Sequence, residues 1–119
     1  MSIKINTGEL YFMFTLRNNE AIADVLSSEV VLIGNYPNPF NPSTTIRYDL
    51  PHPENVRLEI FNVRGQIIKT LVNEPQEAGR HGVIWHGTDN NGRAVTSGVY
   101  FYRLTTDSVS EIRRMLLLK

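Results

Sequence analysis

The sequence predicts an all-β protein that folds as an antiparallel β-sandwich. Three observations lead to this prediction. Apolar and polar residues alternate in short segments through residues 43–119, as they do in half-buried strands. Turn-forming residues separate these segments roughly every 8–12 residues, which is typical of a sandwich. No segment of that region sustains a period of about 3.6 residues, so a helical bundle is not supported.

The chain changes character at Asn35-Tyr36-Pro37-Asn38-Pro39-Phe40-Asn41-Pro42, a segment that we call the octet. Each proline fixes its own φ angle, lacks a backbone donor and pushes the preceding residue away from the α region. The octet is therefore neither a helix nor a central strand. We expect an extended, polyproline-like lead-in to the sandwich, held by Tyr36 and Phe40 if those rings reach a core.

The residues before the octet carry two apolar segments. Residues 9–17 alternate, with four large apolar side chains on one face, and residues 30–33 form a β-branched strand that Gly34 ends. Two or three such strands do not fold alone. Residues 1–34 are therefore expected to be either the end of an upstream β-domain with a connector, or extra N-terminal strands that pack on the rest of the chain. The expected domain boundary lies between residues 34 and 35.

After the octet, the alternation predicts further strands, with a polar loop over residues 73–79 and turns at Gly65 and Gly92. Trp85, in the fourth of these strands, is expected in the core, although Trp85 with Tyr100 and Tyr102 could also stack on a glycan. The predicted strands cover residues 44–50, 56–60, 66–72, 82–86, 99–105 and 109–118.

Composition excludes several classes of function. Twelve basic and twelve acidic residues give a net charge of zero, so no long-range field attracts nucleic acid or an anionic membrane. The absence of cysteine excludes disulfides and thiolate metal sites. No apolar run approaches the roughly 20 residues of a membrane helix. The N-terminus lacks an apolar signal region, so the protein is either cytoplasmic or the tail of a longer chain.

The sequence offers no catalytic or metal-binding constellation. His52 lies between two prolines, and the odd spacing of His81 and His86 places them on opposite faces of a strand. The segment from Asp89 to Gly92 resembles the opening of a calcium loop, but Gly98 occupies the position that needs a glutamate. An Asx-type turn is favoured there. We therefore expect that the protein is not an enzyme and that it binds no metal, cofactor or small-molecule substrate.

The C-terminus is unusual because Met115, Leu116, Leu117 and Leu118 form an apolar run at a chain end. Either this run belongs to a central strand that is covered on both faces, or it is a hydrophobic terminal tag, closed by Lys119, that a receptor binds.

The octet with Ser43-Thr44-Thr45-Ile46 resembles the opening of the type A C-terminal sorting domain of the type IX secretion system. Further motifs of that family occur in register. They are Phe61-Asn62-Val63-Arg64-Gly65-Gln66, Leu71-Val72-Asn73-Glu74 with Ala78-Gly79, Trp85-His86-Gly87-Thr88-Asp89-Asn90-Asn91-Gly92, Ser97-Gly98-Val99-Tyr100-Phe101-Tyr102-Arg103-Leu104, and Arg113-Arg114-Met115-Leu116-Leu117-Leu118-Lys119. Arg114 replaces a common lysine, and His86 occupies a variable position.

The resemblance covers residues 35–119 and implies a seven-stranded immunoglobulin-like sandwich, similar to that of the flagellar hook-capping protein. It also implies an export signal of a Gram-negative bacterium. An upstream cargo would pass the periplasm and reach the cell surface or the medium as part of a longer precursor. The implied partners are the outer-membrane secretion machinery and a sortase-like peptidase that cuts upstream of or near the octet.

The resemblance implies two sets of residues. The residues expected to be recognised by the machinery are Gly98, Tyr100, Tyr102, Arg114, Met115, Leu116, Leu117, Leu118 and Lys119. The residues expected to be structural are Asn35, Tyr36, Pro37, Asn38, Pro39, Phe40, Asn41, Pro42, Gly65, Trp85, Gly87, Asp89 and Gly92.

Two other functions fit the sequence. The domain could be an immunoglobulin-like accessory module that binds glycan through Trp85, or a structural spacer in a larger secreted protein. Residues 1–34 resemble, weakly, the end of a cohesin-type sandwich.

Overall fold

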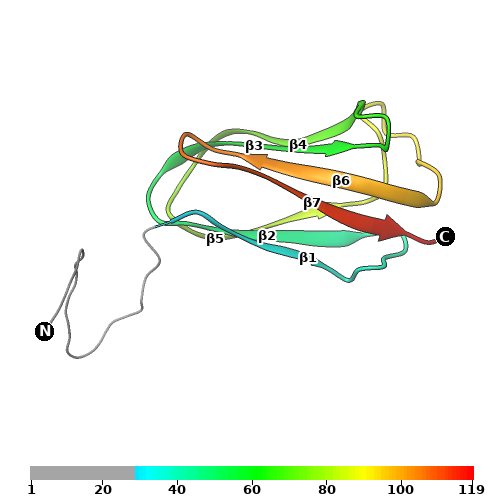
Figure 1. The fold of residues 1–119 in the computed structure, drawn as a ribbon, viewed down its shortest axis with the longest axis horizontal. Coiled ribbons are helices and arrows are strands. Elements are labelled where there is room, and N and C mark those ends of the chain that lie inside the picture. Colours follow the sequence, from blue (N-terminus) through cyan, green and yellow to red (C-terminus); the bar gives the residue numbers. More distant parts are fainter. Residues whose placement is uncertain (1–28) are drawn as a thin grey trace, which may run out of the picture.

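Two antiparallel sheets face each other across a single apolar core (Figure 1). The computed structural model describes residues 29–119, and none of these residues lies in a helix that could cross a membrane. One sheet has the strand order β1-β2-β5 and the other has the order β4-β3-β6-β7. The strands are β1 (Val31–Tyr36), β2 (Thr44–Leu50), β3 (Glu54–Phe61), β4 (Ile67–Gln76), β5 (Gly79–Trp85), β6 (Gly98–Thr105) and β7 (Ser110–Leu117). The predicted sandwich of about seven strands is confirmed.

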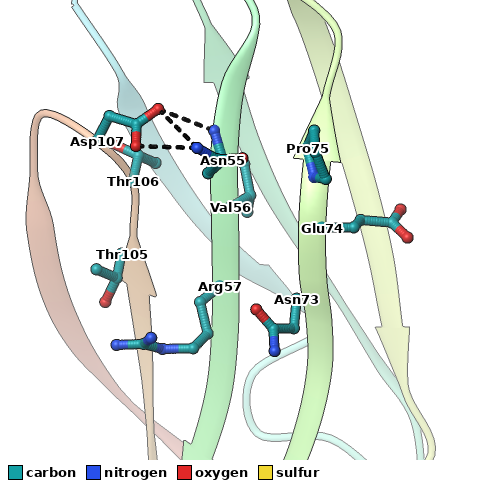
Figure 2. A pocket seen from close by; sticks show the side chains of 9 residues that line it. All are labelled: Asn55, Val56, Arg57, Asn73, Glu74, Pro75, Thr105, Thr106 and Asp107. Atoms are coloured by element: carbon teal, nitrogen blue, oxygen red, sulfur yellow. Dashed lines mark hydrogen bonds between the residues drawn. The ribbon is translucent and has the colours of Figure 1, made fainter.

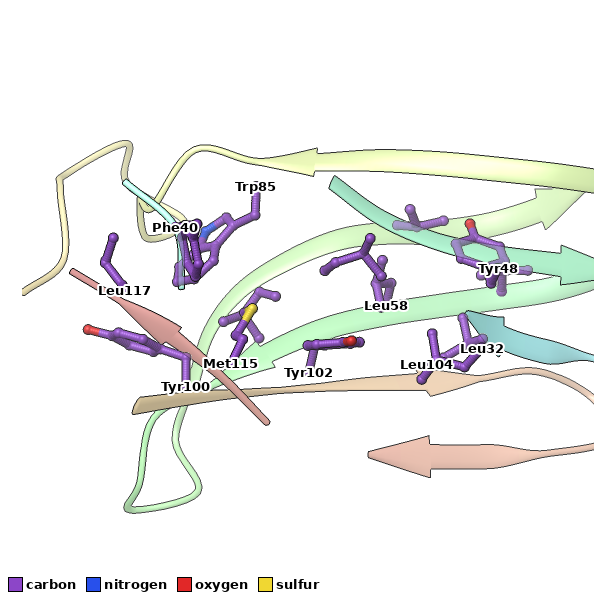
Figure 3. Packing of buried hydrophobic residues seen from close by; sticks show 14 of the residues in the cluster. Leu32, Phe40, Tyr48, Leu58, Trp85, Tyr100, Tyr102, Leu104, Met115 and Leu117 are labelled. Carbon is purple, nitrogen blue, oxygen red and sulfur yellow. The ribbon is translucent and has the colours of Figure 1, made fainter. Parts of the chain in front are cut away.

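Alternate residues of the central strands fill the core, as their sequence pattern predicts. Side chains of β2, β3 and β6 that point between the sheets are buried, and their neighbours in sequence point outward. Figure 3 shows this core from Leu32 to Leu117. The predicted inward residues that are buried are Ile46, Tyr48, Leu50, Val56, Leu58, Ile60, Tyr100, Tyr102 and Leu104.

The predicted polar loop over residues 73–79 is wrong. Strand β4 continues to Gln76 and β5 begins at Gly79, so only two residues connect them. The polar stretch can remain a strand because β4 is the edge of its sheet. Pro75, which has no N–H to donate, is tolerated at such an edge.

The octet is not an extended lead-in. Asn35 and Tyr36 end β1, the chain then bends, and Tyr36 pairs with Thr45 at the start of β2. The octet is thus most of the connection between two paired strands. The hydroxyl of Thr44 holds the bend by donating to the carbonyl of Pro37 (2.7 Å) and accepting from the side-chain amide of Asn35 (3.0 Å).

The two aromatic rings of the octet behave differently. Phe40 is buried in the core, whereas 75% of Tyr36 is exposed. Of the two rings, only that of Phe40 anchors the octet in the core.

Strand β1 crosses the expected boundary between residues 34 and 35. Gly34 does not end the strand; the register shifts between Leu32 and Gly34, and pairing with β2 resumes. Leu32 is buried in the core. The sandwich therefore includes Val31 to Ile33, while the strand predicted at residues 9–17 lies outside the described residues.

Candidate functional site

Strand β7 is an edge strand that runs beside β6. Gly98 pairs with Leu117, and Tyr100 pairs with Met115. The structure therefore brings together the two sequence segments that were expected to carry recognition. The alternative of a central strand covered on both faces is wrong, because only β6 flanks β7 within its sheet and the outward residues Ile112 and Leu118 are 58% and 50% exposed.

The pleat of β7 divides the apolar run into inward and outward residues. Met115 and Leu117 are buried, whereas Leu116 is half-buried and Leu118 is 50% exposed. Because Arg114 and Lys119 are also exposed, the outward residues at this end are Arg114, Leu116, Leu118 and Lys119.

The expected recognition residues of β6 do not all face solvent. Tyr100 and Tyr102 are buried, and Gly98 is half-buried at the start of the strand. The hydroxyl of Tyr100 donates to the carbonyl of Thr96 (2.7 Å). The hydroxyl of Tyr102 donates to the side chain of Asn35 (3.2 Å). Both tyrosines therefore position strands, and their rings are not available to a receptor on the folded surface.

The octet pairs with the end of β7 through backbone hydrogen bonds. The N–H of Phe40 donates to the carbonyl of Leu116, and the N–H of Leu118 donates to the carbonyl of Phe40, both at 3.0 Å. The side chain of Asn38 accepts from the N–H of Leu116 at 3.0 Å. These bonds occupy the backbone groups that an edge strand leaves unpaired. No local pattern in the octet or in the C-terminal segment indicates that the two segments pair.

An aromatic cluster supports this junction from inside. The ring of Trp85 lies 5.7 Å from that of Phe40 and 5.3 Å from that of Tyr100 (Figure 3). Trp85 is 0% exposed, and its indole N–H donates to the carbonyl of Thr88 at 2.8 Å. The prediction that Trp85 belongs to the core is confirmed.

Gly87 brings the chain after Trp85 against the octet. Its φ is 73°, and a Cβ there would lie 3.0 Å from the carbonyl oxygen of Pro42. A side chain at this position would therefore meet backbone as well as an unfavourable conformation. This contact explains why the tryptophan motif has a glycine at position 87.

The loop from Asp89 to Gly92 is the Asx-type turn that the sequence favours. One carboxylate oxygen of Asp89 accepts from the N–H groups of Asn91 (2.9 Å) and Arg93 (3.0 Å). The backbone hydrogen bond from Arg93 is the main reason that the pKa of Asp89 lies below its ordinary value. The carboxylate is thus engaged by its own loop.

The turn that contains Gly65 uses similar chemistry. The side-chain oxygen of Asn62 accepts from the N–H groups of Arg64 (2.9 Å) and Gln66 (3.0 Å).

The histidines do not converge on one site. His81 stacks on the ring of Tyr48 at 5.3 Å, whereas His86 follows the end of β5 and contacts the hydroxyl of Ser43. Burial raises the pKa of Tyr48 to about 12. Within the described part of the chain, no three His, Asp or Glu side chains gather in a way that could hold a metal ion.

Arg113 and Asp107 bind the backbone of neighbouring segments. The guanidinium of Arg113 donates to the carbonyls of Leu32 (2.8 Å) and Ile33 (3.1 Å) in β1. Asp107 accepts from the backbone N–H of Asn55 (3.0 Å), which lowers the pKa of Asp107 (Figure 2). Asp107 and Asn55 border a polar hollow of about 350 Å³ on the four-stranded sheet.

A second hollow adjoins the junction of the octet and β7. It has a volume of about 420 Å³ and is open to solvent. The residues that line it are Asn38, Pro39, Val99, Arg114, Met115 and Leu116. This hollow and the outward residues of β7 form a preformed surface that combines apolar side chains with two cations, Arg114 and Lys119.

Comparison with known proteins identifies the class of domain. Residues 41–110 match the family model described as the FlgD Ig-like domain, and the chain belongs to this family. It is therefore an immunoglobulin-like domain of a structural family. No curated protein matches the sequence.

Solved structures with this fold include two Porphyromonas gingivalis proteins. Dimeric latent PorU has a TM-score of 0.62 and 19% identity over 83% of this chain and 10% of that chain. PorZ, described as an essential surface component of the type-IX secretion system, has a TM-score of 0.51 and 22% identity over 71% of this chain and 11% of that chain. This chain thus spans about a tenth of either protein.

FlgD from Pseudomonas aeruginosa has the same fold, with a TM-score of 0.54 and 19% identity over 73% of this chain and 69% of that chain. At these identities the likeness shows the fold alone.

Proposed function

We propose that this domain is a type A C-terminal sorting domain of the type IX secretion system. It would direct an upstream cargo across the outer membrane to the cell surface or the medium. The observation that carries the proposal is the junction of the octet with β7, where Phe40 binds the backbone of Leu116 and Leu118. The two motifs that resemble the ends of a sorting domain form one folded unit. The fold of this chain is also similar to that of a region of PorZ, and this similarity supports a role in type IX secretion.

The proposed mechanism is recognition of a preformed surface by the secretion machinery. The octet holds the end of β7 so that Arg114, Leu116, Leu118 and Lys119 point outward. The buried residues Tyr100, Tyr102, Met115 and Leu117 would contribute by fixing that strand, and Gly98 by pairing with it. In this proposal the domain has no enzymatic activity and binds no cofactor.

The division of the chain belongs to the same proposal. Residues 1–34 would join the cargo to a sorting domain of residues 35–119, with β1 starting ahead of that boundary at Val31. A sortase-like peptidase would remove the domain after export.

The proposal is tested by fusing the full chain behind a secreted reporter in a host that carries the system. We expect the reporter at the surface or in the medium, and in the periplasm of a strain that lacks the system. A reporter that stays in the periplasm of the complete strain would refute the proposal.

The contribution of the C-terminus requires a substitution rather than a deletion. Deleting residues 115–119 would remove the core residues Met115 and Leu117 and so unfold the sandwich. Leu118→Asp instead changes an exposed side chain. Ile84→Asp, at a similarly exposed position of β5, is the matched control. Export should fall for Leu118→Asp alone; equal export by both variants would favour a spacer.

The buried position of Trp85 does not support a glycan-binding module. Trp85 is enclosed by Phe40 and Tyr100, so its face cannot stack on a sugar.

A further inference from the structure

The outer face of the four-stranded sheet carries apolar side chains near the end at which β7 finishes. Phe61 lies across from Phe101, and Val99 lies across from Leu116. Ile112 is 58% exposed and Val99 is 36% exposed. We define the outer patch as the residues Phe61, Val99, Phe101, Ile112, Arg114 and Leu116.

Two hollows indent the outer patch. One has a volume of about 380 Å³ and is lined by the turn after β3 together with Phe61, Phe101, Arg103 and Ile112. The other is the hollow of about 420 Å³ beside the octet, which Val99, Arg114 and Leu116 line. Apolar side chains of a partner could enter both hollows without disturbing the sheet.

The cations of this face differ in their pairing. Arg57 and Arg103 both bind the carboxylate of Glu59, which is only 6% exposed. The guanidinium of Arg103 also lies 4.6 Å over the ring of Phe61. These two arginines are therefore held by contacts within the domain.

Arg114 has no such contact. It lies directly across from Phe101 in the sheet and is exposed. Among the described residues it has neither an ion-pair partner nor a hydrogen-bond partner. The outer patch therefore presents one uncompensated guanidinium between two apolar hollows.

We propose that the outer patch docks a protein segment that places a carboxylate on Arg114 and apolar side chains in the two hollows. Guanidinium binds a carboxylate through two parallel hydrogen bonds, and such a pair is strongest where apolar contacts exclude water. A protein fits better than an anionic membrane, because the chain has no net charge to draw it to such a surface. This inference rests on the proposed function, since the partner would belong to the export machinery.

The test uses the full chain behind the secreted reporter, with matched variants on the two sheets. Arg114→Glu is compared with Arg47→Glu, which reverses an exposed charge on β2. Ile112→Ser is compared with Ile84→Ser, because these isoleucines are 58% and 51% exposed. Melting curves of the purified variants are the control that shows whether all four fold. Export should fall about tenfold or more for Arg114→Glu, since reversal loses a charge-assisted contact, and less for Ile112→Ser.

A photoreactive residue at position 112 or 84 provides a second readout in exporting cells. A cross-link from position 112 to a peptide that contains Asp or Glu, absent from position 84 and lost in Arg114→Glu, would support the inference.

The outcomes separate the inference from the proposed function. If all four variants are exported like the parent, whereas removing the domain stops export, the docking inference is overturned and the export role stands. If the parent domain does not export the reporter, both fail. Co-sedimentation of the full chain with phosphatidylglycerol vesicles, lost in Arg114→Glu, would assign the patch to lipid and overturn the protein partner.

Discussion

The backbone N–H of Leu118 donates to the carbonyl of Phe40 at 3.0 Å, joining the last residues of the chain to the proline-rich octet. The side chain of Phe40 is buried against Trp85 while its backbone holds β7. One residue thus couples the core to the terminal edge.

Phe40→Ala should destabilise the domain strongly. Removing a buried phenylalanine typically costs about 3–5 kcal/mol through lost transfer free energy and the remaining cavity. Tyr36→Ala, in the same octet, removes a ring that is 75% exposed and should stay within about 0.5 kcal/mol of the parent. Urea unfolding followed by Trp85 fluorescence measures both. Similar losses for the two variants would contradict the assignment of Phe40 as the anchor.

Asn38→Ala should loosen the end of β7 with a smaller global effect. It removes the acceptor for the N–H of Leu116, a hydrogen bond worth roughly 1 kcal/mol. Hydrogen exchange at the Leu116 amide should accelerate, while exchange at the centre of β6 should not change. Asn41→Ala is the control, because the side chain of Asn41 has no hydrogen-bond partner among residues 29–119. Unchanged protection of Leu116 would show that the Asn38 contact is absent in solution.

Two glycine substitutions can separate crowding from backbone conformation. Gly87 and Gly92 have similar φ values, 73° and 79°, so alanine meets the same left-handed penalty of roughly 1–2 kcal/mol at both. Only at Gly87 would the new Cβ also approach the carbonyl of Pro42, at 3.0 Å. Gly87→Ala should therefore lower the midpoint of thermal unfolding further than Gly92→Ala. The reverse order would mean that the octet does not pack against Gly87.

Stability should decline in acid because several carboxyl groups are hydrogen-bonded. The pKa values of Asp89 and Asp107 are lowered chiefly by backbone N–H groups, and that of Asp49 is lowered chiefly by Arg80. A folded pKa below the unfolded value contributes stability that is fully present above the unfolded value. That contribution is lost as the pH falls through the folded pKa. The free energy of unfolding should therefore keep these contributions above about pH 4 and decrease as the pH falls below that value.

Asp107→Asn tests one of these groups. The variant should be less stable than the parent at pH 7, and the difference should shrink as the pH approaches 2. Urea midpoints across that range measure it, and a difference that stays constant would exclude a contribution from ionisation of Asp107.

The regular strands could be predicted because their signal is local. Residues 44–50 alternate cleanly, and β2 has those bounds. Strand β4 was predicted too short because its end is polar and contains Pro75, features that an edge strand tolerates. In the octet, the prolines indicated correctly that no helix forms. They could not indicate the bend, which depends on contacts with Thr44 and β7.

The candidate surface was only partly visible in the sequence for a similar reason. The alternation of β6 already placed Tyr100 and Tyr102 on one face, and that face is the core. Asn38 and Phe40 bind Leu116, and Arg113 binds β1, so these contacts join segments that are about 80 residues apart in the sequence. No local pattern specifies such pairs.

Strands β1 and β7 lie next to each other and run in the same direction (Figure 1). Arg113 binds residues near the start of β1, and Leu116 and Leu118 bind Phe40 beyond its end. The chain therefore enters the sandwich at one end of its long axis and leaves at the other (Figure 1). A force applied between the start of β1 and the C-terminus would load these lateral bonds together, in shear, instead of unzipping them one at a time. The same arrangement that fixes the terminal strand would let the folded domain bear tension along its length.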